Sequence, residues 1–230
     1  MKTIGLIGGM SWESSALYYR LINEDVKQRL GGLHSGCILM FSVDFAPIEA
    51  LQHTGDWDGA AAVLADAARR LEAGGADFFV IGTNTMHRVA DQVAAAVNIP
   101  LLHIADATGA ELVQDCVKRV GLLGTAFTME LDFYKNRISD RYGIEVVVPE
   151  LHDRQMVHDI IYQELCQGKI EPESREVYLA IIDRLNETGI DGVILGCTEI
   201  GLLIEQRHTG IKLYDTTAIH ARQAVTRALA

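Results

Sequence analysis

The chain has 230 residues, of which 49% are hydrophobic and 22% charged, enough for one large α/β domain or two small ones. Its formal net charge is −11, and this acidity argues against nucleic acid as a partner, because phosphate backbones are bound by basic side chains. No apolar run approaches the ~20 residues of a membrane-spanning helix, and the N-terminal run lacks the pattern of a signal peptide. We therefore expect a soluble, cytoplasmic protein that acts on a small molecule, with neither nucleic acid nor membrane as a partner.

Short apolar segments alternate along the chain with amphipathic, alanine-rich segments. The expected strands are residues 3–7, 37–43, 78–81, 101–103, 120–123, 145–148, 192–195 and 212–214, and the expected helices include 14–30, 58–73, 85–96, 174–187 and 218–229. Nearly every strand position is apolar, as is typical of strands covered on both faces. Asp58 is predicted to cap the start of its helix, and Gly74 and Gly75 to end it. The alternation predicts parallel sheets with crossover helices.

Three short motifs occur twice in the same order. Residues 5–10 recur at 121–126, residues 80–85 recur at 194–199, and residues 102–105 are echoed at 213–216, with offsets of 116, 114 and 111. Matches in register suggest a duplicated unit. We expect an α/β fold with two pseudo-symmetric open parallel-sheet domains, 1–105 with the C-terminal helix 216–230, and 106–215. Since ligands bind beyond the carboxyl ends of parallel strands, the active site is expected in the cleft between the domains.

Two glycine-containing loops follow expected strands in the first half. In the loop 8–12, glycines permit close approach and backbone N–H groups can hold a carboxylate, although a plain tight turn is the alternative. The loop matches neither the dinucleotide fingerprint nor the P-loop. In the loop 82–87, a helix start explains one of Thr83, Asn84 and Thr85 as a cap but not all three. The hydroxyl, amide and backbone groups of this loop are therefore predicted to bind the ammonium and carboxylate of an amino acid, although a purely structural role is the alternative.

The four cysteines show no CxxC spacing, so neither a zinc site, a redox motif nor a disulfide is indicated. Cys197 is expected at a strand end just before a helix, where the helix dipole lowers a thiol pKa from its usual ~8.5. Cys37 is expected inside a strand, and Cys116 and Cys166 within or near helices, where inert packing suits them. Cys197 alone leaves open a covalent nucleophile or a proton-transferring base. Spacing does not rank its candidate histidine partners, His87, His103 and His220.

Three motifs together carry a family resemblance over essentially the full length of the chain. They are GLIGGMSWESS at the N-terminus, GTNTMH at 82–87 and GCTEIGLL at 196–203. Together they resemble the aspartate/glutamate racemase family. The resemblance implies two pseudo-symmetric halves, a homodimer, and racemisation without pyridoxal phosphate, other cofactor or metal. It also implies that one residue removes the α-hydrogen while another reprotonates the opposite face.

Most members of that family use two cysteines, one from each half. Here the second-half position is Cys197 but the first-half position is Thr83, which resembles a Thr/Cys subgroup. We expect Cys197 to abstract the α-hydrogen of the L-isomer and Thr83 to deliver a proton, directly or through water. Because a hydroxyl is a far poorer base than a thiolate, L-to-D turnover is expected to be the faster direction. The expected substrate is aspartate or glutamate, or a broader set that includes homoserine.

Carbanion character at Cα must be stabilised by preorganised donors. The expected substrate-binding residues are Met10, Ser11, Gln52, Asn84, Thr85, Thr125, Thr198 and Glu199. Gln52 is included by family position only, in the loop before Asp56, where a solvated residue is the alternative. Glu199 is expected to hold the ammonium or to tune Cys197, although a carboxylate there also raises the thiol pKa.

Two other functions remain open from the sequence. The missing first cysteine favours a degenerate racemase that binds an amino acid without turning it over. A maleate isomerase or hydantoin racemase shares the two-cysteine site, but it needs cysteine chemistry that Thr83 does not offer.

Overall fold

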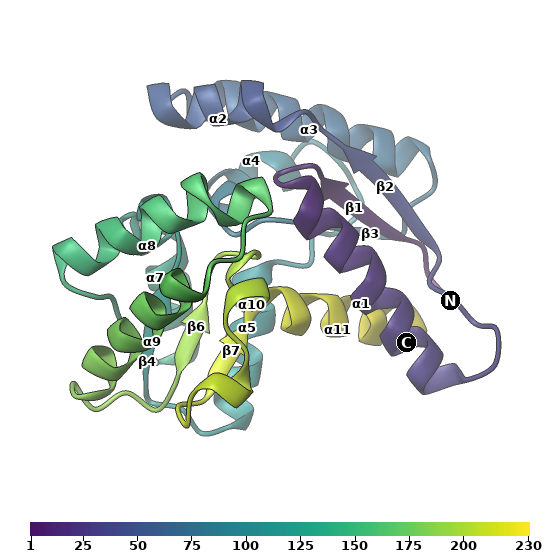
Figure 1. Cartoon of the computed structure of the whole chain (residues 1–230). Coiled ribbons are helices and arrows are strands. Elements are labelled where there is room, and N and C mark those ends of the chain that lie inside the picture. Colours follow the sequence, from purple (N-terminus) through teal and green to yellow (C-terminus); the bar gives the residue numbers. More distant parts are fainter. The chain divides into compact units, whose positions relative to one another are not determined.

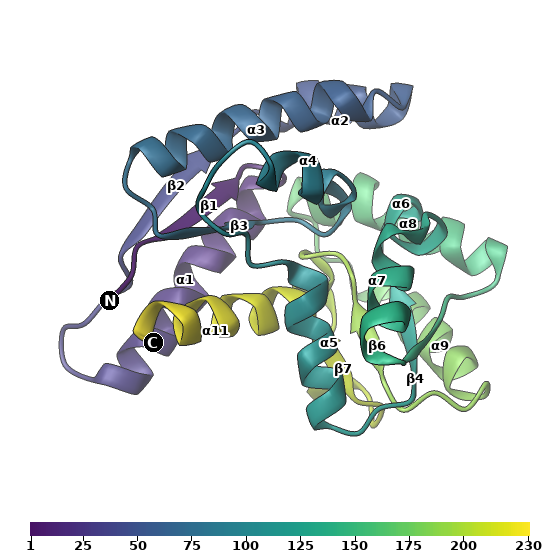
Figure 2. The ribbon, with the colours of Figure 1, turned by 180° about the vertical axis from the view of Figure 1, so that it is seen from behind.

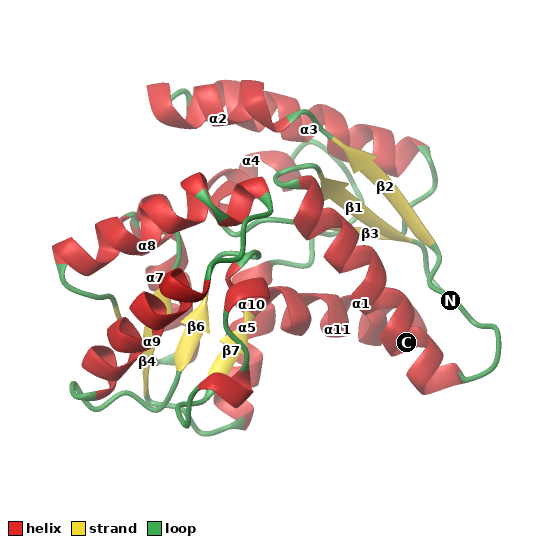
Figure 3. Cartoon of the chain, in the orientation of Figure 1, coloured by secondary structure: helices red, strands yellow, loops and turns green.

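The computed structural model describes residues 1–230 and divides them into two units, residues 1–104 with 220–230, and residues 105–219. The first unit contains a parallel sheet of three strands and the second a parallel sheet of four. Helices and strands alternate in both units (Figure 3). The predicted α/β fold with two open parallel sheets is confirmed. None of the helices combines the length and apolar character that crossing a bilayer requires.

The sheet of the first unit has the order β2-β1-β3, with β1 (Ile4–Gly8) between β2 (Ile38–Ser42) and β3 (Phe78–Ile81). All residues of β1 and β3 are buried, as their continuous apolar sequences predict. The expected strand at 101–103 is wrong. Only a single bridge joins Leu101 to Phe79, because Pro100 has no N–H to extend a ladder and the chain turns into a helix at Ile104.

Helices cover both faces of this sheet (Figure 1). One face carries α1 (Trp12–Leu30) and α11 (Thr216–Leu229), and the other carries α2 (Phe45–Thr54), α3 (Trp57–Ala73), the 3₁₀ turn η1 (Thr85–Val89) and α4 (Ala90–Ala94). Ile4 and Leu6 pack under α1 and α11, whereas Ile7 packs under the alanine-rich α3. The alternation of side chains along β1 therefore supplies two hydrophobic cores.

The helix ends of the first unit differ in detail from expectation. Asp56, not Asp58, caps α3, because the Asp56 Oδ1 accepts from the Gly59 N–H at 2.9 Å and Asp58 lies in the first turn. Gly74 ends α3 as predicted. The single helix expected over 85–96 is divided into η1 and α4, since Val89 departs from helical dihedrals at φ −106° and ψ 14°.

The sheet of the second unit has the order β5-β4-β6-β7. Its strands are β4 (Arg119–Leu123), β5 (Glu145–Val147), β6 (Val193–Leu195) and β7 (Leu213–Asp215). Its helices are α5 (Ile104–Gln114), α6 (Ala126–Glu130), α7 (Asp132–Tyr142), α8 (Leu151–Gln163), α9 (Pro172–Asn186) and α10 (Ile200–Leu203), with 3₁₀ turns η2 (Leu165–Gln167) and η3 (Gln206–His208). Figures 1 and 2 show α9 on one face of this sheet and α5 and α7 on the other.

The two sheets share one topology. Ile7 pairs with Ile81 in the first unit, and Leu123 pairs with Leu195 in the second, which reproduces the offsets of 116 and 114 seen in the sequence. The bridge from Phe79 to Leu101 corresponds to the pairing of Val193 with Leu213. That correspondence gives an offset of 112 between Leu101 and Leu213, so the third sequence match is corrected by one residue.

Two cysteines are exposed where buried packing was expected. Cys37 lies one residue before β2. Its carbonyl oxygen accepts a hydrogen bond from the Ile4 N–H of β1 at 2.8 Å, and its side chain is exposed. Cys116 lies in the turn after α5 with φ +60°. Cys37 thus lies outside the strand that was expected to contain it, whereas Cys116 lies near a helix as expected but with its side chain exposed.

His220 of α11 is fully buried between two partners of the first unit. Its Nε2–H donates to the Leu102 carbonyl oxygen at 2.9 Å, so its Nδ1 accepts from the Tyr18 hydroxyl at 2.7 Å. Burial lowers the pKa of His220 from 6.5 to about 4. Between about pH 4 and pH 6.5 this imidazole is therefore neutral in the folded chain but protonated in the unfolded chain.

Replacing His220 should flatten the dependence of stability on pH. Since the unfolded chain binds the extra proton, the free energy of unfolding falls as pH decreases from 6.5 towards 4, by about 3 kcal/mol for a shift of this size. Urea unfolding at pH 7 and at pH 4 measures how much the free energy of unfolding decreases between these two values. This decrease should be smaller in His220→Gln than in wild type by about 3 kcal/mol. The exposed His34→Gln should leave the wild-type pH dependence in place. If His220→Gln lost as much free energy of unfolding between pH 7 and pH 4 as the wild type, the buried neutral His220 would not be the source of the pH dependence.

Candidate active site

In the first unit the chain leaves the sheet at Gly82. The Gly82 N–H donates to the Ile7 carbonyl oxygen at 2.9 Å, which is the last ladder bond between β3 and β1. Thr83 follows at once and is half-buried. A Cβ on Gly82 would lie 3.2 Å from the Ile7 oxygen, so the absence of a side chain keeps this exit close to β1.

The second unit repeats this arrangement at Gly196. The Gly196 N–H donates to the Leu123 carbonyl oxygen at 2.6 Å, and a Cβ on Gly196 would lie 2.9 Å from the same oxygen. Cys197 follows at once and is half-buried. Thr83 and Cys197 thus occupy equivalent positions, each one residue beyond the last bond of an equivalent pair of strands.

His87 fixes the backbone of Thr83. Its Nδ1 lies 2.7 Å from the Thr83 carbonyl oxygen, and its Nε2 accepts from the Ile104 N–H at 3.2 Å. With Nε2 as an acceptor, Nδ1 carries the proton and donates it to Thr83, so the ring is neutral. The His87 ring also packs on that of His103, with 4.4 Å between centroids. Both nitrogens of His87 and of His220 are thus engaged within the first unit, which sequence spacing did not reveal.

Cys197 has a carboxylate as its hydrogen-bond partner. The Cys197 Sγ–H and the Thr198 hydroxyl both donate to the Glu199 Oε2, each at 2.9 Å. Thr198 and Glu199 are both only 2% exposed. A buried carboxylate therefore accepts the hydrogen bond of the thiol, in the place where a covalent mechanism would need a histidine.

The thiol pKa moves in the opposite direction to the one expected from a helix dipole, and in the direction expected from a carboxylate at Glu199. Burial raises the pKa of Cys197 well above its usual value, and the charge of Glu199 raises it further, with a smaller contribution from Cys166. The expected helix dipole is weak, because α10 begins only at Ile200 and has four residues. At neutral pH Cys197 is consequently a protonated thiol and not the predicted thiolate.

Gln52 lies in a helix and not in the loop expected for it. It occupies the last turn of α2, is 3% exposed, and its Nε2 donates to the Met86 Sδ at 3.0 Å. The sequence signals of this helix were the capping Asp44 and the terminal Gly55, which adopts a left-handed conformation. The solvated alternative for Gln52 is therefore wrong.

The loop after β1 uses its polar groups to form the turn itself. The Gly9 N–H donates to the Ser15 Oγ at 2.7 Å, and the Ser15 hydroxyl donates to the Ser11 carbonyl oxygen at 2.9 Å. Ser11 also caps α1 by accepting from the Ser14 N–H at 3.3 Å. Gly9 has φ +96°, and a Cβ there would lie 2.1 Å from the Val43 oxygen. The Gly9 amide is thus occupied within the protein, in agreement with the tight-turn alternative for that residue.

The remaining predicted binding residues are buried in the same loops. Asn84 precedes η1 without making a side-chain capping bond, and Thr85 is its first residue. Thr125 caps α6 by accepting from the Thr128 N–H at 3.3 Å. The first unit contains Met10, Ser11, Gln52, Thr83, Asn84 and Thr85, and the second contains Thr125, Cys197, Thr198 and Glu199, of which the last three share the Glu199 carboxylate. No group of three or more His, Cys, Asp or Glu side chains is arranged to hold a metal ion.

Comparison with known proteins identifies the family of this chain. A family model described as Asp/Glu/hydantoin racemase matches residues 7–224. A solved structure from Yersinia pestis, assigned to the Asp/Glu racemases, is 51% identical with a TM-score of 0.93, and an aspartate racemase homologue from Pyrococcus horikoshii OT3 is 34% identical with a TM-score of 0.85, each match covering 100% of both chains. The broad specificity amino-acid racemase RacX of Bacillus subtilis (strain 168) is 26% identical over 76% of this chain and 75% of its own length.

Neutralising Glu199 should make the Cys197 thiol more acidic. Glu199→Gln removes the negative charge that opposes the thiolate, so the pKa of Cys197 should fall. The rate at which iodoacetamide alkylates Cys197 can be measured at a series of pH values by mass spectrometry of the Cys197 peptide. The pH at which this rate increases should be lower in Glu199→Gln than in wild type. The control Glu205→Gln removes an exposed carboxylate that pairs with Arg207 and should leave the profile unchanged. If the alkylation rate of Glu199→Gln increased at the same pH as in wild type, or at a higher pH, the role given to this carboxylate would be wrong.

Proposed function

Because this chain belongs to the Asp/Glu/hydantoin racemase family, we propose that it interconverts the L- and D-forms of an amino acid by two-base proton transfer at Cα, with Cys197 and Thr83 as the two groups and no pyridoxal phosphate. The equivalence of these two residues carries the proposal: each follows the glycine that makes the last ladder bond of its sheet. The proposal places the chain in a Thr/Cys subgroup, and it requires both side chains to reach one carbon from opposite faces.

The proposed substrate is aspartate or glutamate, or a broader set of amino acids that includes homoserine. The resemblance to racemases of aspartate supports the narrow set, and the likeness to a broad specificity racemase supports the wider one. The proposed groups for the ammonium and carboxylate are the buried polar side chains Asn84, Thr85, Thr125 and Thr198, and the proposed site also includes Met10, Ser11 and Gln52. Family resemblance also supports a homodimer.

The protonated thiol sets the order of proton movements in this proposal. Cys197 first passes its proton to the Glu199 Oε2, 2.9 Å away, and the resulting thiolate removes the α-hydrogen of the L-isomer. Preorganised donors around the α-carboxylate stabilise the carbanion character that develops at Cα. The Thr83 hydroxyl then delivers a proton to the opposite face. Solvent replaces the proton of Thr83 and takes the one held by Glu199, which restores the starting state.

The two directions of reaction are chemically unequal in this scheme. Removing the α-hydrogen of the D-isomer would require Thr83 as the base, and a threonine hydroxyl is a far poorer base than a thiolate. We therefore propose faster L-to-D than D-to-L turnover. The bias is kinetic, because a catalyst leaves the equilibrium between enantiomers unchanged.

An amino-acid-binding protein without turnover is the second candidate. The observation that favours it is Thr83, which stands where a two-thiol mechanism has a cysteine. Hydantoin racemase and maleate isomerase activities rank lower for the same reason.

A chiral assay in deuterated buffer separates these functions. Purified protein incubated with L-aspartate, L-glutamate or L-homoserine should form the D-isomer carrying deuterium at Cα, and exchange should be faster from the L- than from the D-enantiomer. Chiral chromatography with mass spectrometry measures both quantities. Absence of any D-isomer, together with a ligand-induced rise in melting temperature, would establish the binding protein instead. Equal exchange from both enantiomers would contradict the proposed bias.

Variants of the two proposed bases should affect the two directions differently. Cys197→Ala should lower α-hydrogen exchange by a factor on the order of 10³, as expected for loss of a positioned base. Thr83→Cys should supply a second thiol and speed D-to-L turnover. The exposed Cys116→Ala serves as the matched thiol control and should keep wild-type exchange. Full exchange in Cys197→Ala would show that another group is the base.

A further inference from the structure

Thr83 is held through its backbone on both sides of its Cα atom. On one side the Gly82 N–H donates to the Ile7 carbonyl oxygen at 2.9 Å, and on the other the Thr83 carbonyl oxygen accepts from the His87 Nδ1–H at 2.7 Å. Within the first unit the Thr83 hydroxyl itself makes no hydrogen bond. The direction of that hydroxyl therefore depends on the backbone, and the imidazole of His87 fixes one of the two ends of this short segment.

The second unit has no imidazole in this position. With the offset of 114 residues, Thr83 corresponds to Cys197 and His87 corresponds to Gly201. The Cys197 carbonyl oxygen accepts from a backbone group, the Ile200 N–H, at 3.1 Å. A bond from an imidazole is thus a feature of the exit that carries the hydroxyl.

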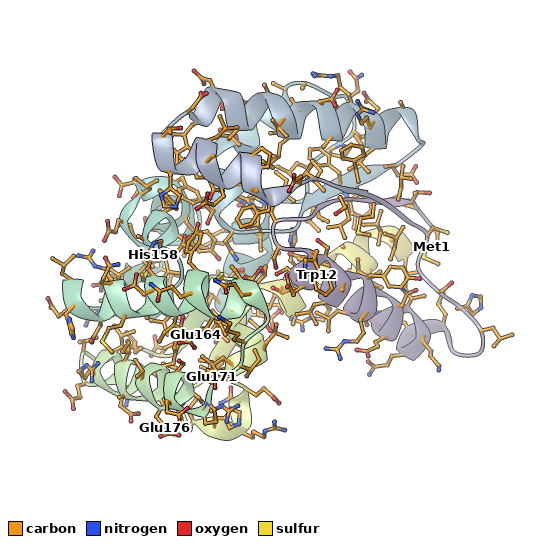
Figure 4. The ribbon with its side chains drawn as sticks, turned by 45° about the horizontal axis from the view of Figure 1, so that its top comes forward. Met1, Trp12, His158, Glu164, Glu171 and Glu176 are labelled. Atoms are coloured by element: carbon orange, nitrogen blue, oxygen red, sulfur yellow. The ribbon has the colours of Figure 1, made fainter.

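The second unit places a histidine at a different loop. His158 of α8, labelled in Figure 4, accepts from the Ala126 N–H at 3.1 Å. Ala126 begins α6, directly after the loop that follows β4, whereas Cys197 follows β6. His158 therefore supports the second unit's counterpart of the loop 8–12 and not the counterpart of the loop that contains Thr83.

His87 is itself anchored where the chain leaves the first unit. The chain passes to the second unit between residues 104 and 105 and returns between residues 219 and 220. The Ile104 N–H donates to the His87 Nε2 at 3.2 Å, and the His220 Nε2–H donates to the Leu102 carbonyl oxygen at 2.9 Å. The His87 ring also packs against the rings of His103 and His220, with centroids 4.4 and 6.0 Å away. Residues at both crossings of the chain thus brace the ring that holds Thr83.

Only one tautomer of His87 makes both of its bonds. Nδ1 must carry the proton to donate to Thr83, and Nε2 must be unprotonated to accept from Ile104. The amide of asparagine branches from the same carbon position as Nδ1, so His87→Asn keeps a donor for Thr83 but loses the acceptor for Ile104. The longer amide of glutamine extends as far as Nε2, so His87→Gln keeps that acceptor but loses the donor. The two variants therefore separate the two bonds of one side chain.

We propose that His87 is a positioning residue for proton delivery: through its Nδ1–H bond to the Thr83 carbonyl oxygen, it holds the Thr83 hydroxyl in the direction from which that hydroxyl protonates Cα. This role rests on the proposed racemisation and deepens it, because it adds a residue that acts through Thr83 and not on the substrate itself.

The fate of the deprotonated substrate reports on the position of Thr83. After Cys197 removes the α-hydrogen, delivery from Thr83 gives the D-isomer, whereas return from Cys197, once its thiol has exchanged with solvent, gives back the L-isomer. In deuterated buffer both products carry deuterium at Cα. A displaced hydroxyl slows the first fate and leaves the second, so the ratio of deuterated D- to deuterated L-isomer falls. A general loss of folded protein lowers both products equally and leaves this ratio unchanged.

Initial rates of the two deuterated products, measured by chiral chromatography with mass spectrometry, test the proposal. With L-aspartate, L-glutamate or L-homoserine as substrate, His87→Gln should lower the D-to-L product ratio about fivefold, within the range for loss of one hydrogen bond. His87→Asn should stay near the wild-type ratio, because it keeps the donor for Thr83. The exposed His34→Gln is the matched control and should keep the wild-type ratio. Thermal melts establish that each variant is folded.

NMR of the wild-type protein gives a second readout that needs no substrate. Long-range proton–nitrogen correlation spectra should show His87 with a protonated Nδ1 and an unprotonated Nε2, its signals being those absent from the His87 variants. The opposite tautomer, an unchanged product ratio in His87→Gln, or an equal fall in both His87 variants would overturn the positioning role alone. A wild type that incorporates no deuterium at Cα, or Thr83→Ala that forms the D-isomer at the wild-type rate, would overturn the proposed two-base reaction and this role with it.

Discussion

Two backbone hydrogen bonds fix the geometry on which the candidate site depends: Gly82 N–H to Ile7 oxygen at 2.9 Å, and Gly196 N–H to Leu123 oxygen at 2.6 Å. Each is the last bond of a buried parallel ladder, so the residue that follows is held by the sheet before it enters an irregular loop. Because the order β2-β1-β3 of the first sheet is repeated by β5-β4-β6 in the second, this constraint operates twice and sets Thr83 and Cys197 at equivalent exits. Rigid strands thus position the side chains proposed for catalysis, and the loops provide the polar groups around them.

The electrostatics around Cys197 oppose the thiolate that a base requires. Burial raises the pKa of the Cys197 thiol, and the Glu199 charge raises it further, so both favour the protonated form. The same carboxylate accepts the thiol hydrogen bond, so the group that disfavours the thiolate also gives its proton a destination 2.9 Å away. Thr83 is held differently, through its backbone carbonyl and the neutral ring of His87. In the proposed reaction the two units therefore contribute different chemistry from equivalent positions.

The sequence predicted those parts of the fold that are set by continuous apolar runs. The buried strand at Phe78–Ile81 was placed at its observed bounds, and the repeated motifs coincide with equivalent strand ends. Features decided by tertiary partners were missed. Leu101 has a single bridge because Pro100 cannot extend the ladder, Asp56 caps α3 in place of Asp58, and Gln52 is buried on a helix that lacks a strong apolar period. The sequence suggested that Glu199 raises the pKa of Cys197, but it did not reveal the burial that contributes most to the shift, because burial depends on the tertiary fold.

The proposed mechanism requires one thiol and one hydroxyl to act on opposite faces of a single Cα atom. A crystal structure with a bound, unreactive amino-acid analogue that keeps the α-ammonium and α-carboxylate tests it most directly. The proposed mechanism predicts that the Cys197 Sγ and the Thr83 Oγ1 lie on opposite sides of Cα, each within about 3.5 Å, the separation of groups poised to react. An analogue bound away from either residue, or both residues on the same face of Cα, would contradict it.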